Sequence, residues 1–336
     1  MTNPIRRLYK TSPRVRRLAR RTKNAGVTLL VQLALGVLGR LSLERALRVG
    51  EWAGGMAYRL LRGARTLAIE HLRVAFGDEL TPTGREHLAR ASFVNVARCF
   101  CELAKIDEIH ARRDTYFDAE GWEHLETVLA EGRGAVVVTG HIGNWELLGA
   151  YAAWRGVPVA AVARRIYASR LNRLIVDFRQ RQGVQTILRE SPTSARQILQ
   201  ALKNNAFLAI VMDQDTHAPS VSVPFFGRVA RTPAAAASLA IRSDLPVLAM
   251  FMQRRPAGGQ RVIVSPPFVV QRSSDKTADI AALTRQFNVA LEAQIRKNPA
   301  EWVWWHRRWR HAPLPHLDLD RDFQYTLPNV AMRGRG

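Results

Sequence analysis

The chain has 336 residues, of which 47% are hydrophobic, enough to bury the core of one large domain. Its formal net charge of +22 indicates an anionic partner, and anionic lipid, an acidic carrier protein and nucleic acid all qualify. The two cysteines, Cys99 and Cys101, are too few and too close for a disulfide framework, and no Cys or His spacing is typical of a metal site, so a reducing cytoplasmic setting is expected.

The N-terminus combines charge with hydrophobicity. Residues 1–24 hold nine basic residues and no acidic one, and residues 25–39 form an uncharged, largely apolar run. The run is shorter than the roughly 20 residues that a helix needs to cross a bilayer core. We therefore expect a helix that lies in the inner leaflet, with the basic segment on the cytoplasmic side binding anionic headgroups. The alternative is an ordinary hydrophobic helix with a basic tail.

Residues 25–106 are predicted to be a helical, membrane-associated region that precedes the main domain. Thr81 and Pro82 are typical of the N-cap and first turn of a helix, and that helix should run through residue 103. Breaks between the helices are predicted at Gly54-Gly55, at Gly63 and at the turn of residues 77–82.

Residues 107–313 alternate β-branched runs with helical patterns, which predicts an α/β domain with a mixed, mainly parallel sheet flanked by helices. Strands are predicted at residues 134–139, 157–163, 185–188, 207–212, 245–252 and 260–264. Helices are predicted at residues 147–154, 170–182, 193–204 and 233–242, followed by a long C-terminal helix that ends at Asn298-Pro299. Residues 314–336 form a polar tail that we expect to be unstructured.

The chain is organised around the stretch from Gly134 to Glu146, which has the pattern of a strand, a glycine-containing turn and a helix. His141 then lies at the carboxyl end of a strand, where open α/β sheets collect ligands. Five residues separate His141 from Glu146, so the two side chains meet only if His141 precedes the helix and Glu146 lies in its first turn. Such a pair suits a general base and the carboxylate that orients it, although a loop histidine before a helix acid has the same spacing.

Charged residues also follow two other predicted strands. Arg164 comes directly after residues 157–163, where a guanidinium could bind phosphate or stabilise developing negative charge; the alternative is a solvated arginine. Asp213 and Asp215 follow residues 207–212, and such a pair of carboxylates could hold magnesium, as in some phosphatases.

Four tryptophans interleave with basic and imidazole side chains in residues 301–310. This mixture is typical of nucleic-acid stacking or of a membrane interface. No nucleic-acid-binding pattern occurs elsewhere, so nucleic acid is not an expected partner, and a membrane interface or a phosphate-lined acceptor pocket is favoured. Packing of the tryptophans on the sheet beneath His141 is the alternative, and it is compatible with both.

The segment His141-Ile-Gly-Asn-Trp-Glu146 resembles the H-x₄-[D/E] signature of the bacterial lipid A late acyltransferases and of related phosphatidylinositol-mannoside acyltransferases. The spacing alone is weakly specific, but further blocks occur in the family's order and extend the resemblance over roughly residues 26–313. These blocks are Val162-Ala163-Arg164, Asp213-Gln214-Asp215, residues 223–227 and residues 304–309.

The resemblance implies a glycerolipid-acyltransferase-like fold and an O-acyltransferase on the cytoplasmic face of the cell inner membrane, without metal or cofactor. The enzyme would move a fatty acyl chain from acyl carrier protein, or from acyl-CoA as second choice, to a hydroxyl of an anionic glycolipid. Lipid A precursors are the commonest acceptors in the family.

The resemblance also assigns roles to residues. His141 would deprotonate the acceptor hydroxyl, and Glu146 would orient His141. Backbone amides at Gly143 and Asn144, with Arg164, would stabilise the oxyanion. One of Asp213 and Asp215 would belong to the site in a structural or orienting role.

Two other classes of function stay open. A metal-dependent phosphoesterase would use Asp213 and Asp215 as metal ligands. A non-catalytic protein that binds anionic lipid would account for the charge and the tryptophans, but it would leave the turn at His141 without a purpose.

Overall fold

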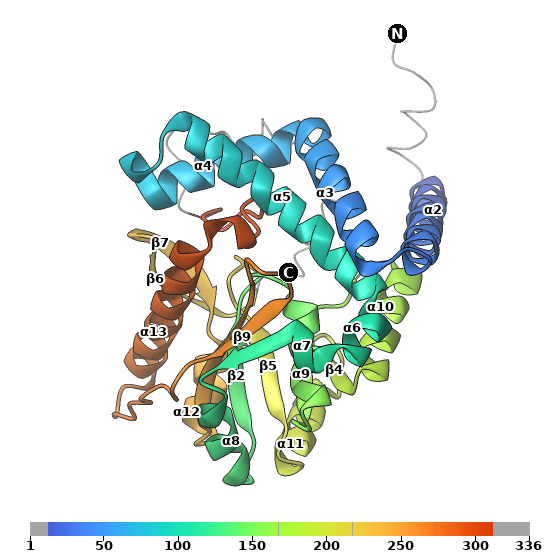
Figure 1. Cartoon of the computed structure of the whole chain (residues 1–336). Coiled ribbons are helices and arrows are strands. Elements are labelled where there is room, and N and C mark those ends of the chain that lie inside the picture. The colour runs from blue at the N-terminus through green and yellow to red at the C-terminus, as the bar shows by residue number, and fades with distance from the viewer. Residues whose placement is uncertain (1–12, 167, 217, 312–336) are drawn as a thin grey trace.

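The computed structural model describes residues 13–166, 168–216 and 218–311, and its centre is a seven-stranded sheet of order β1-β9-β8-β2-β5-β3-β4 (Figure 1). Neighbouring strands are parallel except β8 and β9, so the predicted mixed, mainly parallel sheet is confirmed. The strands are β1 (Phe117–Glu120), β2 (Ala135–Thr139), β3 (Val159–Ala163), β4 (Val184–Leu188), β5 (Phe207–Val211), β8 (Val247–Arg254) and β9 (Gln260–Val264).

Helices cover both faces of the sheet. They are α8 (Trp122–Ala130), α9 (Trp145–Trp154), α10 (Ser169–Arg181), α11 (Ser194–Lys203), α12 (Ala235–Arg242) and α13 (Lys276–Lys297), with a 3-10 turn at Pro299–Glu301. Successive side chains of a strand point to opposite faces. Val136 and Val138 of β2 therefore join the core under α11, α12 and α13, whereas Val137 joins the core under α8 and α9. All five residues of β2 are buried, which explains its uninterrupted apolar sequence.

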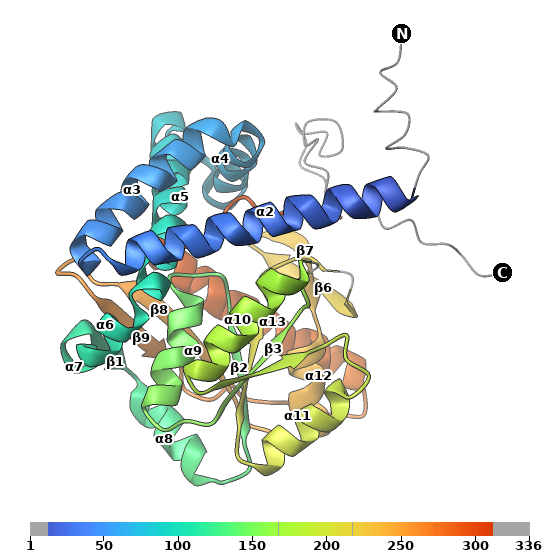
Figure 2. The ribbon, with the colours of Figure 1, turned by 90° about the vertical axis from the view of Figure 1, so that its right-hand side faces the viewer.

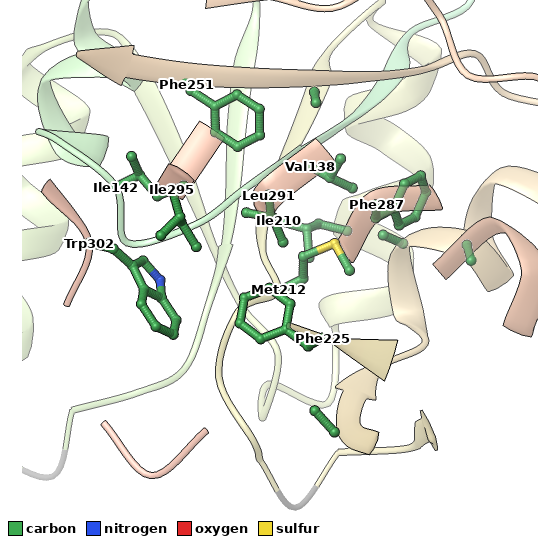
Figure 3. Close-up of a cluster of buried hydrophobic side chains, with 14 of the residues drawn as sticks. Val138, Ile142, Ile210, Met212, Phe225, Phe251, Phe287, Leu291, Ile295 and Trp302 are labelled. Atoms are coloured by element: carbon green, nitrogen blue, oxygen red, sulfur yellow. The ribbon is translucent and has the colours of Figure 1, made fainter. Parts of the chain in front are cut away.

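The carboxyl ends of β2 and β5 rest on the C-terminal helix. Figure 3 shows Val138, Ile210 and Met212 facing Phe287 and Leu291 of α13 in one buried cluster. The predicted long C-terminal helix is confirmed, and it ends at Lys297 with Asn298 as its C-cap. The cluster fixes the ends of the two strands whose following residues form the site described below.

Helices of the N-terminal region pack above one end of the sheet (Figure 1). Those above the sheet are α3 (Leu43–Leu60), α4 (Arg62–Phe76) and α5 (Pro82–Ala104), with a 3-10 turn at Gly77–Glu79. The region also contains α2 (Pro13–Gly39), α6 (Ile106–Ala111) and α7 (Arg113–Tyr116). Thr81 caps α5 as predicted, because its hydroxyl accepts a hydrogen bond from the Gly84 amide. The predicted break at Gly54-Gly55 is wrong. Gly54 instead lets α3 approach the backbone of α5 so closely that a Cβ would collide with Val94.

Helix α2 runs along one side of the molecule and contacts α5 and α10 (Figure 2). It joins residues 13–24 of the basic segment to the apolar run in one continuous helix. No helix in the described ranges combines the length and hydrophobicity needed to cross a bilayer. The first 12 residues and the predicted tail of residues 314–336 lie outside the described residues.

Several elements were not predicted, namely β1, α7, α8 and a hairpin. Strands β6 (Ser220–Phe225) and β7 (Arg228–Pro233) form an antiparallel hairpin that packs on α13. Its turn residues Phe226 and Gly227 both have positive φ, as a tight two-residue hairpin turn requires. Pro224 within β6 obscured the strand, because proline is rare inside strands and interrupts the expected pattern.

Candidate active site

His141 and Asp213 are brought together by the sheet. They follow neighbouring parallel strands, β2 and β5, in which Thr139 is paired with Val211 and the Met212 amide donates to the Thr139 carbonyl. Each side chain lies two residues beyond its strand, at the same edge of the sheet. Parallel strands align their carboxyl ends, so residues that follow them meet even when 72 positions apart in sequence.

Asp213 holds His141 at two points. Its Oδ1 atom lies 2.7 Å from His141 Nδ1, and its Oδ2 atom accepts the His141 backbone N–H at 2.8 Å. Trp302 donates its indole N–H to the same Oδ2 atom at 2.7 Å. The Asp213 carboxylate is fully buried, whereas the His141 side chain remains 23% exposed. With Nδ1–H directed at Asp213, the Nε2 atom of a neutral His141 can accept a proton.

Electrostatics support this pairing. Burial alone lowers the pKa of His141, but the charge and hydrogen bond of Asp213 outweigh it, with a smaller contribution from Glu146, so the pKa is raised. Burial raises the pKa of Asp213, yet the nearby His141 and the hydrogen bonds from His141 and Trp302 hold that pKa well below its usual range. The site is therefore a carboxylate-oriented imidazole, the arrangement of a general base.

Glu146 does not orient His141, which corrects the role expected for it. Its carboxylate instead accepts two hydrogen bonds from Arg179 of α10, at 2.8 Å from Nε and 2.6 Å from Nη2. Burial alone lowers the pKa of Arg179, but pairing with Glu146 raises it. Both residues line the large cavity described below. The pair thus ties the first turn of α9 to α10 in the cavity wall.

The Gly143 amide does not have its expected role, and the Asn144 side chain has structural partners. The Gly143 amide donates to the Glu301 carbonyl at 3.0 Å, so it is not directed at an oxyanion. Asn144 is buried, and its side chain accepts the Leu147 amide and donates to Cys99 and Glu102 of α5. Gly143 and the Asn144 side chain thus hold the turn, and the role expected for the Asn144 backbone amide stays a prediction.

Arg164 and Asp215 follow strands β3 and β5, as predicted, and both line the cavity. Arg164 is exposed and follows β3 directly. The Asp215 carboxylate is buried and lies 2.6 Å from His311 Nδ1, so it serves a different histidine from Asp213. Within the described ranges, no group of three or more His, Cys, Asp or Glu side chains is placed to bind a metal ion.

Trp302 of the tryptophan segment lies against the His141–Asp213 pair. Trp302, Trp304 and Trp309 are almost completely buried, so they do not face a membrane. Trp304 packs on Trp302, whereas Trp309 packs on His71 and Phe225. A bridge pairs Ile142 with Trp302, and the Val303 amide donates to the His141 carbonyl. The role of Trp302 as a donor to Asp213 was missed, because no local sequence signal connects residues 89 positions apart.

A cavity of about 2170 Å³ opens beside His141. One part of it lies beneath α9 and is apolar. That part is lined by Val137, Leu148, Ala152, Val157, Val159, Phe178, Val184, Phe207, Ala209 and Met250. Arginines gather in another part of the lining, namely Arg164, Arg165, Arg189, Arg307 and Arg310. The base thus lies beside both an apolar chamber and a cationic surface.

Comparisons with known proteins agree with this description. Residues 12–311 match the model of the family described as bacterial lipid A biosynthesis acyltransferase. The chain is 29% identical to the phosphatidylinositol mannoside acyltransferase of Mycolicibacterium smegmatis, over 80% of this chain and 87% of that protein. It is 22% identical to the lipid A biosynthesis palmitoleoyltransferase of Escherichia coli K12, over 81% of this chain and 87% of that protein.

Among solved structures, the chain is similar to the 1-acyl-sn-glycerophosphate acyltransferase PlsC of Thermotoga maritima. The match has 14% identity and a TM-score of 0.34, and it covers 71% of this chain and 98% of PlsC.

Proposed function

We propose that this chain, which belongs to the bacterial lipid A biosynthesis acyltransferase family, transfers a fatty acyl chain from a thioester to a hydroxyl of an anionic glycolipid. The observation that carries the proposal is the His141–Asp213 pair beside a cavity that is apolar on one side and cationic on another. The apolar part suits an acyl chain, and the arginines suit phosphate groups.

The proposed reaction is direct transfer. His141 Nε2 takes the proton of the acceptor hydroxyl while the hydroxyl oxygen attacks the thioester carbonyl carbon. The tetrahedral intermediate collapses, the carbon–sulfur bond breaks, and the imidazolium returns its proton to the departing thiolate. An ester and a free thiol are formed. Arg164, at the cavity, is proposed to stabilise the oxyanion.

An acyl-enzyme intermediate is not part of the proposal. Cys99 and Cys101 lie buried in α5. Burial raises the pKa of both thiols, to about 11 for Cys101, so neither is activated as a nucleophile. Asp213 has both oxygens bonded to protein donors, which favours its orienting role over that of a ligand in a metal-dependent phosphoesterase.

The proposed donor is acyl carrier protein, whose acidic surface suits a chain with a net charge of +22, and acyl-CoA is the second choice. The proposed acceptors are phosphatidylinositol mannosides and lipid A precursors, the substrates that the names of the relatives indicate. Purified protein should be incubated with each donor and each acceptor, and the lipids analysed by mass spectrometry. A mass gain of one acyl chain in the acceptor supports the proposal. Metal-dependent release of phosphate without acyl transfer would contradict it and support a phosphoesterase instead.

The apolar chamber leads to a prediction on chain length. Gly149 lines the cavity on α9, and an added Cβ would meet Val184 at an ordinary contact distance of 3.7 Å. Gly149→Ala should therefore keep the preference of the enzyme. Gly149→Leu should shift the preference to shorter donors, by about fourfold in kcat/KM for each methylene displaced. Steady-state kinetics with acyl donors of increasing length measure this shift, and an unchanged preference in Gly149→Leu would contradict the assignment of the acyl chamber.

Membrane attachment through α2 is likewise proposed. Val27, Leu30, Leu33 and Val37 recur at helical spacing and are each at least 40% exposed, so α2 presents an unburied apolar face. Such a helix suits the headgroup region of an anionic bilayer, where each nearby Lys or Arg contributes about 1 kcal/mol. The protein would then act at the cytoplasmic face of the inner membrane.

The double substitution Leu30→Glu/Leu33→Glu should weaken binding to anionic vesicles, because it places two charges on this face of α2. Leu199→Glu is the matched control, since Leu199 is similarly exposed (56%) but lies on α11. Vesicle co-sedimentation measures the binding. Equal sedimentation of the double variant and the control would show that the attachment lies elsewhere.

A further inference from the structure

The turn between β2 and α9 is held from behind by the N-terminal helix α5. Gly143 has a φ of +57°, and a Cβ there would collide with the Met252 carbonyl, so only glycine fits. The Cys99 thiol of α5 donates to the Gly143 carbonyl at 3.2 Å. The turn that carries His141 is therefore positioned by α5 as well as by the sheet.

Asn144 connects this turn to α5. Its Oδ1 atom accepts the Leu147 amide at 3.2 Å and caps the N-terminus of α9. Its Nδ2 group donates to Glu102 Oε2 at 2.9 Å and to the Cys99 carbonyl at 3.2 Å. One buried side chain thus links the helix start on one side to a buried carboxylate on the other.

Glu102 is the fixed end of that link. Its fully buried carboxylate accepts hydrogen bonds from Tyr116 at 2.8 Å and Gln260 at 2.8 Å, and from both Nη atoms of Arg254 at 2.6 and 3.2 Å. Burial raises the pKa of Glu102, but Arg254 and the other donors outweigh it and lower that pKa, so the group stays anionic. A carboxylate held by three residues besides Asn144 has little freedom to move.

We infer that Glu102 is a positioning residue for the proposed base His141, acting through Asn144 and the turn between them. Asp213 bonds both the ring and the backbone N–H of His141, so the ring and the backbone must be placed together. A displacement of the turn at Asn144 would loosen both bonds, although Glu102 itself touches neither partner. The effect of Glu102 on reaction rate rests on the proposed acyl transfer by His141, whereas its effect on the position of His141 does not.

Asn144→Ser tests the link with little disturbance of the helix. Serine is an equally good N-cap, so the hydroxyl can still accept the Leu147 amide, but the amide group that reaches Glu102 is lost. Asn288→Ser is the matched control. Asn288 is also fully buried, and it donates to Pro224 and Thr232 on the hairpin, away from the turn. Both variants should lose similar amounts of thermal stability.

The first measurement is the pKa of His141 by NMR of the imidazole in the full-length protein. Asp213 raises this pKa, so a loosened pair should let it fall in Asn144→Ser and stay unchanged in Asn288→Ser. Glu102→Gln should also lower the pKa of His141. This variant loses the charge opposite Arg254 and is therefore less stable, so the pKa is measured from the NMR signals of the folded protein. An unchanged His141 pKa in folded Asn144→Ser overturns the inference, whether or not the protein transfers acyl chains.

The second measurement is acyl transfer. Asn144→Ser should lower kcat by about 10–100-fold with little change in KM for the donor, because a misplaced base affects the chemical step and not the cavity. Loss of activity in equal proportion in both variants would overturn the positioning role and leave a merely structural one. A lowered His141 pKa in Asn144→Ser, together with no transfer by the wild-type protein, would uphold the positioning and reject the proposed function.

Discussion

His141→Ala is expected to lower acyl transfer by about 10²–10⁴-fold, the usual contribution of a general base. The side chain is partly exposed and lies at the cavity, so its removal should leave the folded structure intact. Initial rates with saturating donor and acceptor measure the loss, and a thermal unfolding curve checks the fold. A folded His141→Ala protein with near-normal transfer would contradict the mechanism.

The substitution should also show which residue acts with His141. If Asp213 works only through His141, the double variant His141→Ala/Asp213→Asn should be scarcely slower than His141→Ala alone. Additive losses would instead indicate that Asp213 contributes independently to catalysis.

Asp213→Asn is expected to lower acyl transfer by a large part of the same factor, on the order of 10²–10⁴-fold, although it changes one atom. Three donors face the carboxylate, and two of them, the His141 N–H and the Trp302 indole, point at Oδ2. The single carbonyl oxygen of asparagine can best satisfy those two. Its NH₂ group then faces His141 Nδ1, so the proton of the ring must move to Nε2, which can no longer accept one.

Asp118→Asn provides the control for this change. Asp118 is also paired with basic side chains, Arg255 and Arg261, but it lies on the edge strand β1. The Asp118→Asn variant should keep its acyl-transfer activity. Comparable loss in both variants would show that removal of any paired carboxylate impairs the protein, and it would contradict a specific role for Asp213.

The pH dependence provides a further test of the pair. His141 must be neutral to act as a base, so the rate should fall as the pH drops through its pKa. Asp213 raises that pKa above the ordinary value for histidine. Residual activity of Asp213→Asn should therefore have its acid limb at lower pH than the wild-type enzyme. If the acid limb of Asp213→Asn lies at the same pH as that of the wild-type enzyme, a group other than His141 controls the rate in this range.

The corrected role of Glu146 shows the limit of local spacing. The five-residue separation from His141 is compatible with contact, and the first turn of α9 does bring Glu146 to the same cavity. Its carboxylate nevertheless pairs with Arg179, because α10 packs alongside and supplies a guanidinium with two matching donors. Nothing between residues 141 and 146 indicates this partner. Arg179 lies on α10, which is the next helix along the chain and is separated from α9 by β3.

The sequence by itself determined most elements of the sheet and the chemistry available at their ends. Alternating apolar runs predicted the α/β sheet, and the burial of both faces of β2 is the reason that its sequence is continuously apolar. The same patterns placed His141, Arg164 and Asp213 after strands. Local patterns suffice for such conclusions, because a run of five to ten residues records which sides of an element are covered.

Only the tertiary structure decided which of these residues meet. Strand order is set by long-range pairing, and the insertion of β5 between β2 and β3 aligns Thr139 with Val211. That register puts Asp213, and not Glu146, against the ring of His141. The buried tryptophans and the link from Glu102 to Asn144 likewise join segments that are distant in sequence. Such contacts form because the whole fold must bury its apolar faces and satisfy its buried polar groups together, and no local pattern specifies them.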